Sequence, residues 1–188
     1  MPGPCYLITH PEVAVDPRTE VTSWSLSAAG RARAARLAAQ PWVPALDRLV
    51  SSAERKARET AAVLAAAHGL PWTVDAALGE NDRSATGFLP PEEFEQVADA
   101  FFARPQESVR GWEAARHAQQ RVVAAVRRHT TGGTDAVGFV AHGAVGTLLW
   151  CDLERRPVDR RHDQPGQGSW YPFDPVTWTA GHGWVRIS

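Results

Sequence analysis

Short apolar runs alternate with longer amphipathic segments along most of the chain. The apolar runs are partly β-branched, which predicts buried strands over residues 5–9, 46–51, 72–78 and 136–141. The segments between them carry apolar residues at helical spacing, which predicts helices over 27–40, 52–68, 91–104, 109–129 and 145–153. The last segment, residues 169–188, alternates aromatic residues with glycine and predicts one or two short strands with a turn near residues 181–183.

Several helix boundaries carry recognisable signals. Ser27 can cap the first helix, and Gly30 is a local weakness inside it. Ser51 and Glu54 have the spacing of a capping box for the second helix, which Gly69 is expected to end. The first helix is expected to pack closely through its small face, formed by Ala29, Ala32, Ala35, Leu37 and Ala38.

The order of these elements predicts the fold. Strands that alternate with helices favour an α/β domain of three layers, with helices on both faces of a mostly parallel sheet. The helical segment at about 79–105 is a candidate lid over the ligand-binding site of this sheet. Ligands of such sheets bind beyond the carboxyl ends of the strands. His10 and His142 each follow a predicted strand and Ser51-Ser52 follow a third, so we expect these polar residues at one rim.

Length and composition bound the class of protein. The chain has 188 residues, of which 44% are hydrophobic and 22% charged, so one globular domain over residues 1–188 is expected. The formal net charge of −1 disfavours a bulk electrostatic grip on nucleic acid or on a membrane surface. Two cysteines cannot form a disulfide framework, and neither a membrane span nor a signal peptide is indicated, which favours a cytoplasmic protein.

One compositional feature points to a single position. The chain contains nineteen arginines but only one lysine, Lys56. Most lysines are solvated surface residues, yet this one lies in the first turn of the second predicted helix, where a helix N-terminus favours anions.

Five segments, taken in order, resemble one enzyme family. Residues 7–12, Leu-Ile-Thr-His-Pro-Glu, resemble the first-strand motif of the histidine phosphatase superfamily, the phosphoglycerate mutase-like enzymes, which normally has Arg-His-Gly-Glu after two apolar residues. Residues 51–61 resemble the family stretch Ser-Ser-Pro-Leu-x-Arg-Ala-x-Gln-Thr-Ala. Further similar segments are the helix start at 26–30, the Glu-Ser to Arg-Val segment at 107–122 and the His-Gly turn at 140–145.

This resemblance implies phosphoryl transfer through a covalent phosphohistidine. His10 would attack phosphorus as a neutral imidazole, and water would later hydrolyse the intermediate. His142 would donate to the phosphoryl oxygens as their charge develops. A carboxylic acid would protonate the leaving oxygen, and Glu80 is the first choice for it, with Asp82 the second. No metal or other cofactor is implied.

The departures from the family motif fall on the residues that would bind phosphate. Thr9 replaces an arginine, so a bidentate clamp becomes a neutral hydroxyl, and Pro11 replaces a glycine. Lys56 replaces the second phosphate-binding arginine and offers a point charge in place of a planar fork. Thr9 and Lys56 remain candidate phosphate ligands. The chain also offers spare arginines nearby, at Arg18, Arg55 and Arg83.

Two functions therefore compete. The first is a phosphatase that hydrolyses phosphoric monoesters or phosphohistidine, with a small phosphorylated substrate or a phosphoprotein as its partner. The alternative is a weakened or inactive member of the same fold that binds a phosphorylated or anionic ligand. Trp24 lies in the loop that should cross the pocket and is a candidate ligand contact. The sequence indicates no oligomeric state, and it carries no Gly-x-Ser-x-Gly elbow of a serine hydrolase.

Overall fold

The computed structural model describes residues 3–188 and joins seven strands into one sheet. The strand order is β3-β2-β4-β1-β5-β6, and β7 pairs with β5. The first four strands run parallel to their neighbours, whereas β5 is antiparallel to β1, which confirms the predicted mostly parallel sheet. The strands are β1 (Cys5–Thr9), β2 (Arg48–Ser51), β3 (Trp72–Val74), β4 (Val137–Ala141), β5 (Ser169–Asp174), β6 (Thr179–Ala180) and β7 (Val185–Arg186).

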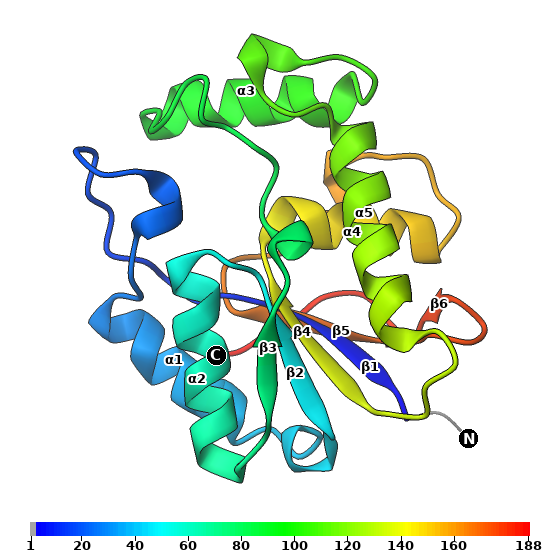
Figure 1. Ribbon diagram of the computed structural model, residues 1–188. Helices are drawn as coiled ribbons and strands as arrows, with labels where there is room; N and C mark the ends of the chain where they lie inside the picture. The colour runs from blue at the N-terminus through cyan, green and yellow to red at the C-terminus, as the bar shows by residue number, and fades with distance from the viewer. Residues whose placement is uncertain (1–2) are drawn as a thin grey trace.

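Helices cover both faces of the sheet, as the element order predicts. Figure 1 shows α1 and α2 on one side, α4 and α5 on the other, and α3 beyond one end of the strands. None of the helices within residues 3–188 is long and apolar enough to cross a membrane. The five α-helices of this range are α1 (Ala28–Ala38), α2 (Arg55–His68), α3 (Pro91–Ala103), α4 (Ala115–Thr130) and α5 (Gly143–Leu153).

The central strands supply a separate hydrophobic core to each face. Successive side chains of a strand point to opposite faces, so Leu7 joins the core beneath α3, α4 and α5 while Ile8 joins the core beneath α1 and α2. Phe139 and Val140 divide between the same two cores. This burial on both faces explains why β1 and β4 are continuous apolar runs in the sequence.

Two predicted elements are shorter than expected. The strand expected over 72–78 ends at Val74, because the Asp75 carboxylate accepts a hydrogen bond from the Ala77 amide and turns the chain into a short 3-10 helix. The helix expected over 109–129 begins only at Ala115. Arg110 and Gly111 before it have positive φ, which is incompatible with a continuous α-helix.

The start of α2 also differs from the prediction. The helix begins at Arg55, and its N-cap residue Glu54 makes no side-chain capping bond. Ser52, and not Ser51, accepts a hydrogen bond from the Glu54 amide at 3.1 Å. The predicted capping box is therefore wrong, and the Glu54 carboxylate is free to point away from its own helix. Gly69 ends α2 in the left-handed region with φ of 66°, as predicted.

The buried face of α1 differs from the expected alanine stripe. Ala29, Ala32 and Ala35 are exposed, and the buried residues of α1 are Gly30, Ala34, Leu37 and Ala38. Gly30 determines which face of α1 is buried, because a Cβ atom built there would lie 2.0 Å from the Glu12 carbonyl oxygen. The glycine that weakens the isolated helix is therefore what lets α1 approach the loop after β1.

Replacing Gly30 with alanine should lower the free energy of unfolding by about 2 kcal/mol, because the added methyl group meets a backbone oxygen that cannot move freely. Chemical denaturation of G30A measures the change. Gly183→Ala is the matched control, since a Cβ there meets no atom within 4 Å, and it should change stability by less than about 0.5 kcal/mol. Equal stability of G30A and G183A would contradict this packing account.

Candidate functional site

Parallel pairing of β1 with β4 brings the two motif histidines together. Thr9 is opposite Ala141 in the register, so the next residues, His10 and His142, leave the sheet side by side. The His10 amide donates to the Ala141 carbonyl at 3.2 Å, which holds the two strand ends together. The imidazole rings lie 5.2 Å apart between centroids, edge to face. The structure thus joins two residues that are far apart in the sequence.

The His10 ring is held with one nitrogen free. Its Nδ1 lies 2.8 Å from the carbonyl oxygen of Pro11, and a carbonyl can only accept a hydrogen bond. Nδ1 therefore carries the hydrogen and Nε2 carries the lone pair. Burial, assisted by the positive charge of Lys56, lowers the pKa of His10 to about 4, so the ring is neutral near pH 7. Pro11 has no amide hydrogen, but its carbonyl oxygen orients the His10 ring.

His142 is fully buried beside the end of β2. Its Nε2 shares a hydrogen bond of 2.7 Å with the hydroxyl of Ser52, and the Glu54 carboxylate lies 3.4 Å from the same nitrogen. Nδ1 has no hydrogen-bond partner within residues 3–188. Burial keeps the pKa of His142 well below its usual value in spite of the nearby carboxylate. In the neutral tautomer whose Nε2 accepts the hydrogen of the Ser52 hydroxyl, Nδ1 carries the ring hydrogen and is a donor without a partner in the described residues.

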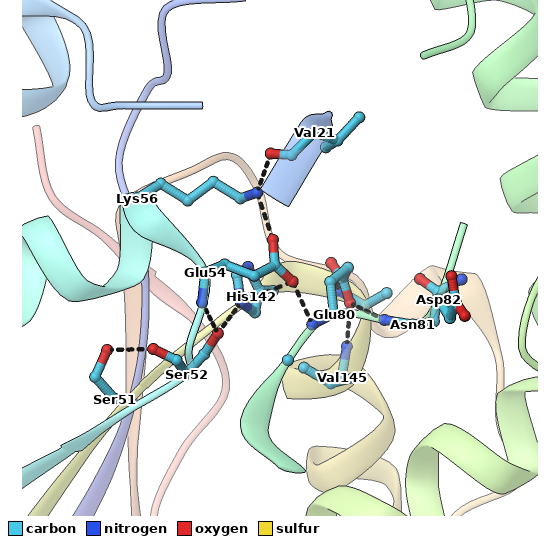
Figure 2. A network of polar contacts seen from close by, with 12 residues as sticks. Val21, Ser51, Ser52, Glu54, Lys56, Glu80, Asn81, Asp82, His142 and Val145 are labelled. Atoms are coloured by element: carbon cyan, nitrogen blue, oxygen red, sulfur yellow. Dashed lines mark hydrogen bonds and ion pairs between the residues drawn. The ribbon is translucent and has the colours of Figure 1, made fainter. Parts of the chain in front are cut away.

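Lys56 is held inside the site by an ion pair with Glu54. Figure 2 shows the ammonium group between the Glu54 carboxylate and the Val21 carbonyl, to which it donates at 2.8 Å. The Lys56 side chain is only 3% exposed and the Glu54 side chain 11%. Burial alone would raise the pKa of Glu54, but the Lys56 ammonium and the hydrogen bond from the Glu80 amide outweigh this effect and hold the pKa below its usual value. Glu54 is therefore an anion, and it also accepts the Glu80 amide at 2.9 Å.

Glu80 lies at the N-terminus of α5. Its carboxyl group accepts hydrogen bonds from the amides of Ala144 and Val145, each at 3.1 Å. Burial raises the pKa of Glu80, so this group retains a proton more readily than an exposed glutamate does. Arg121 of α4 fixes the segment that carries it by donating to the carbonyls of Ala77 and Gly79 at 2.8 and 2.9 Å.

Asp82 has the wrong environment for a proton donor. It is exposed, and hydrogen bonds from Ser84 lower its pKa, so it is ionised near neutral pH. Of the two carboxylic acids that the sequence offers, Glu80 is the one beside the histidines.

The candidate phosphate ligands are placed very differently. Arg83 lines the same cavity as His10 and Lys56. Arg18 does not reach it: the side chain is 89% exposed and paired with Asp16, two residues earlier in the loop. The expectation that Arg18 binds phosphate is therefore corrected.

Two other candidates are also turned away from the histidines. Thr9 is fully buried, and its hydroxyl bonds Gln164 at 2.7 Å and the backbone of Ser169. The hydroxyl is thus used in joining β1 to the C-terminal segment, and its expected contact with phosphate is corrected. Arg55 points outward and pairs with Glu59.

The cavity beside His10 has an apolar wall. It holds about 360 Å³, with His10, Lys56 and Arg83 among its lining residues. Trp24 and Phe88 both line it and contact each other, with ring centroids 5.9 Å apart, so Trp24 does line the pocket. The Trp24 indole nitrogen donates to the Asp16 carbonyl, which leaves the ring as an apolar surface. The other apolar residues of this wall include Val13, Val21, Leu89 and Phe94.

A smaller polar cavity of about 190 Å³ adjoins the first. His10 and Arg83 line both cavities, and Glu80 and Asn81 line the smaller one. The Asn81 side-chain nitrogen is buried without a partner in the described part of the chain, so it is a free donor beside Glu80. Within the same described range, no group of three or more His, Cys, Asp or Glu residues could hold a metal ion.

Sequence reasoning missed Glu54 and Asn81 as parts of this site. Glu54 had a signal, because it replaces the leucine of the resembled Ser-Ser-Pro-Leu-x-Arg stretch with an acid two residues before Lys56. Its assignment to a capping box concealed that signal. Asn81 carried no such signal in the sequence, since an asparagine between Glu80 and Asp82 is typical of a turn.

Comparisons with known proteins identify a family and solved structures with the same fold. The model of the histidine phosphatase superfamily (branch 1) matches residues 5–178. Similar solved structures include a mycobacterial glucosyl-3-phosphoglycerate phosphatase (TM-score 0.82, 20% identity, 99% of this chain and 100% of that one). Another is a putative alpha-ribazole-5'-P phosphatase from Escherichia coli (TM-score 0.76, 21% identity, 99% and 97%). A third is a phosphoserine phosphatase from Entamoeba histolytica (TM-score 0.73, 16% identity, 92% and 90%). No curated protein sequence matches the chain.

The buried neutral histidines should make the fold sensitive to acid. Because the pKa of His10 is lowered from 6.5 to about 4, the unfolded chain binds a proton that the folded protein does not over that range. Stability is therefore lost as the pH falls from about 6.5 to about 4, by about 3 kcal/mol for this residue. His10→Gln should flatten the pH dependence of the free energy of unfolding, measured by denaturation. His117→Gln, on the exposed side of α4, is the control, and an unchanged slope in H10Q would contradict the account.

Proposed function

The chain belongs to the histidine phosphatase superfamily (branch 1), and on this premise we propose that it hydrolyses phosphoric esters through a phosphohistidine on His10. The observation that carries the proposal is the orientation of His10. The Pro11 carbonyl holds Nδ1–H, so the lone pair of Nε2 is available at the cavity that Lys56 and Arg83 line. A neutral imidazole in this state is a nucleophile without any further base.

The reaction then takes two steps. In the first, the Nε2 lone pair of His10 attacks phosphorus, a phosphorus–nitrogen bond forms, and the ester oxygen leaves with its electron pair. Glu80 supplies a proton to that oxygen. In the second, the oxygen of a water molecule attacks phosphorus and the electron pair of the phosphorus–nitrogen bond returns to Nε2. The water gives a proton to the Glu80 carboxylate, which restores the acid. The product is inorganic phosphate from a monoester, and a monoester from a diester.

The remaining site residues stabilise charge on the phosphoryl oxygens. The free nitrogen of His142, the Lys56 ammonium and the Arg83 guanidinium are the donors that we assign to this task. Arg83 is held in place by its contacts with two rings, since its guanidinium carbon lies 5.2 Å from the centre of Phe94 and 5.5 Å from that of Trp112. Arg83 is thus the arginine that we assign in place of the one lost at Thr9.

The substrate in this proposal is a small phosphorylated molecule with an apolar or aromatic alcohol. The wall formed by Trp24 and Phe88 offers contact area but few hydrogen bonds, which favours an apolar group. Segment 79–105 supplies Phe88 and Phe94 to this wall, and we assign it the role of a lid over the substrate. The free, buried thiols of Cys5 and Cys151 are consistent with our expectation of a cytoplasmic protein.

A second candidate function is binding of a phosphorylated ligand without turnover. The observation that favours it is the loss of cations, since Thr9 offers no charge and Lys56 is paired with Glu54. The two functions differ in whether phosphorus becomes bonded to His10.

His10→Ala should abolish turnover of a generic aryl phosphate, because no other group can form the intermediate. Wild-type protein, quenched during turnover of that ester, should carry an acid-labile phosphoryl group that mass spectrometry detects and that H10A lacks. His117→Ala is the control and should retain both. Equal activity of H10A and wild type would exclude the mechanism, and binding without turnover in the wild type would favour the second candidate.

Trp24→Ala should lower kcat/KM for naphthyl phosphate by roughly tenfold, because an aromatic contact of one to two kcal/mol is lost. The same variant should change kcat/KM for glycerol phosphate by less than about threefold, since the polar glycerol group gains little from contact with an apolar wall. Phe88→Ala should reproduce the effect, while Val176→Ala, on a distant exposed turn, should not. Equal losses with both substrates would contradict the assignment of this wall.

A further inference from the structure

Glu54 places a negative charge inside the site that the proposed function assigns to a phosphoryl group. Its carboxylate contacts three groups there: the Lys56 ammonium, the imidazole of His142 at 3.4 Å and the Glu80 amide at 2.9 Å. Figure 2 shows the carboxylate between Lys56 and His142, with both oxygens engaged. A residue of this charge is unexpected beside an anion site, because it repels the ligand and occupies one of the donors of Lys56.

The ion pair also uses up the hydrogen-bonding capacity of Lys56. An ammonium group has three donors, and Lys56 directs one to the Val21 carbonyl and another to Glu54. One donor is left for a ligand. The charge of the ammonium is largely cancelled by the adjacent carboxylate, and both side chains are too buried for water to screen their interaction.

Among the cations that line the two cavities, one makes no ion pair in the described part of the chain. Arg83 makes no ion pair within residues 3–188, whereas Arg160, at the rim of the smaller cavity, is paired with Glu95 and Asp99. Asp163 lines the smaller cavity and bonds Thr147 and the Gln164 amide.

We propose that Glu54 is a specificity-determining residue that adapts the anion site between His10 and His142 to a phosphoryl group carrying one negative charge. A phosphodiester is such a ligand, whereas a phosphomonoester carries close to two charges above its second pKa of about 6. With Lys56 paired to Glu54, Arg83 is the one cation of the site that is unpaired within residues 3–188, so a second negative charge on the ligand meets no unpaired cation in a buried place. The inference rests on the proposed function, because it concerns the same phosphoryl site.

Equilibrium binding of two small esters to wild type and Glu54→Gln tests the proposal. At about pH 8, methyl phosphate carries two negative charges and dimethyl phosphate carries one. Wild type should bind dimethyl phosphate at least as tightly as methyl phosphate. Because Coulomb energy scales with ligand charge, E54Q should tighten methyl phosphate by about tenfold and dimethyl phosphate by only about threefold. Isothermal titration calorimetry at fixed pH and ionic strength measures both affinities.

Two further variants keep the test decisive. Glu59→Gln removes the same charge from the same helix at a residue that pairs with Arg55 and Arg31 outside the cavity, so its affinities should equal those of wild type. Glu54→Leu removes the charge without leaving a polar group. It should change the two affinities as E54Q does, and it takes the place of that variant where E54Q does not fold. The proposal would be overturned if the affinities for the two esters changed equally or did not change. It would also be overturned if both Glu54 variants bound more weakly than wild type, or if neither wild type nor the variants bound either ester.

Failure of this inference is distinguishable from failure of the proposed function. Binding is measured without turnover, so a charge preference that depends on Glu54 can be observed in a protein that forms no phosphohistidine. Conversely, an active enzyme whose preference does not change in E54Q and E54L would exclude the role of Glu54 alone.

Discussion

The parallel pairing of β1 with β4 is the constraint on which the site depends. With Thr9 opposite Ala141, the two strands end at the same level and deliver His10 and His142 to one rim. A slip of one residue would turn every side chain of β1 to the other face and separate the histidines. The apolar residues of both strands are buried on two faces, so packing fixes this register strongly. The core of the fold and the geometry of the site are therefore set by the same contacts.

Burial also sets the charge states at that rim. The histidines lie against the sheet, where the cost of desolvation keeps both rings neutral, and this is the state that a nucleophile needs. The same low exposure makes Glu54 and Lys56 depend on each other, since either charge would be costly to bury alone. An anion site with few free cations results from these two effects together.

The sequence was most informative where local chemistry and packing agree. The strands β1 and β4 were predictable from their apolar runs because both of their faces had to be buried. The end of α2 at Gly69 was predictable because glycine readily adopts the left-handed conformation found there. The family resemblance is confirmed by the match over residues 5–178. The side-chain partners were not predictable. The carboxylate of Glu54 was assigned to capping the backbone of α2 but contacts the side chains of Lys56 and His142. Gly30 acquires its role only from the Glu12 backbone, which reaches α1 through the tertiary fold. The roles of His10, His142, Glu80, Lys56 and Arg83 in catalysis stay predictions.

The central claim is that phosphorus becomes bonded to Nε2 of His10, and a crystal structure of the protein with vanadate tests it most directly. Vanadate adopts the five-coordinate geometry of phosphorus under attack. The account predicts vanadium bonded to Nε2 of His10, with its oxygens contacting His142 and Arg83 and one apical oxygen directed toward Glu80. Vanadate bound elsewhere in the cavity, with Nε2 of His10 unbonded, would contradict the account.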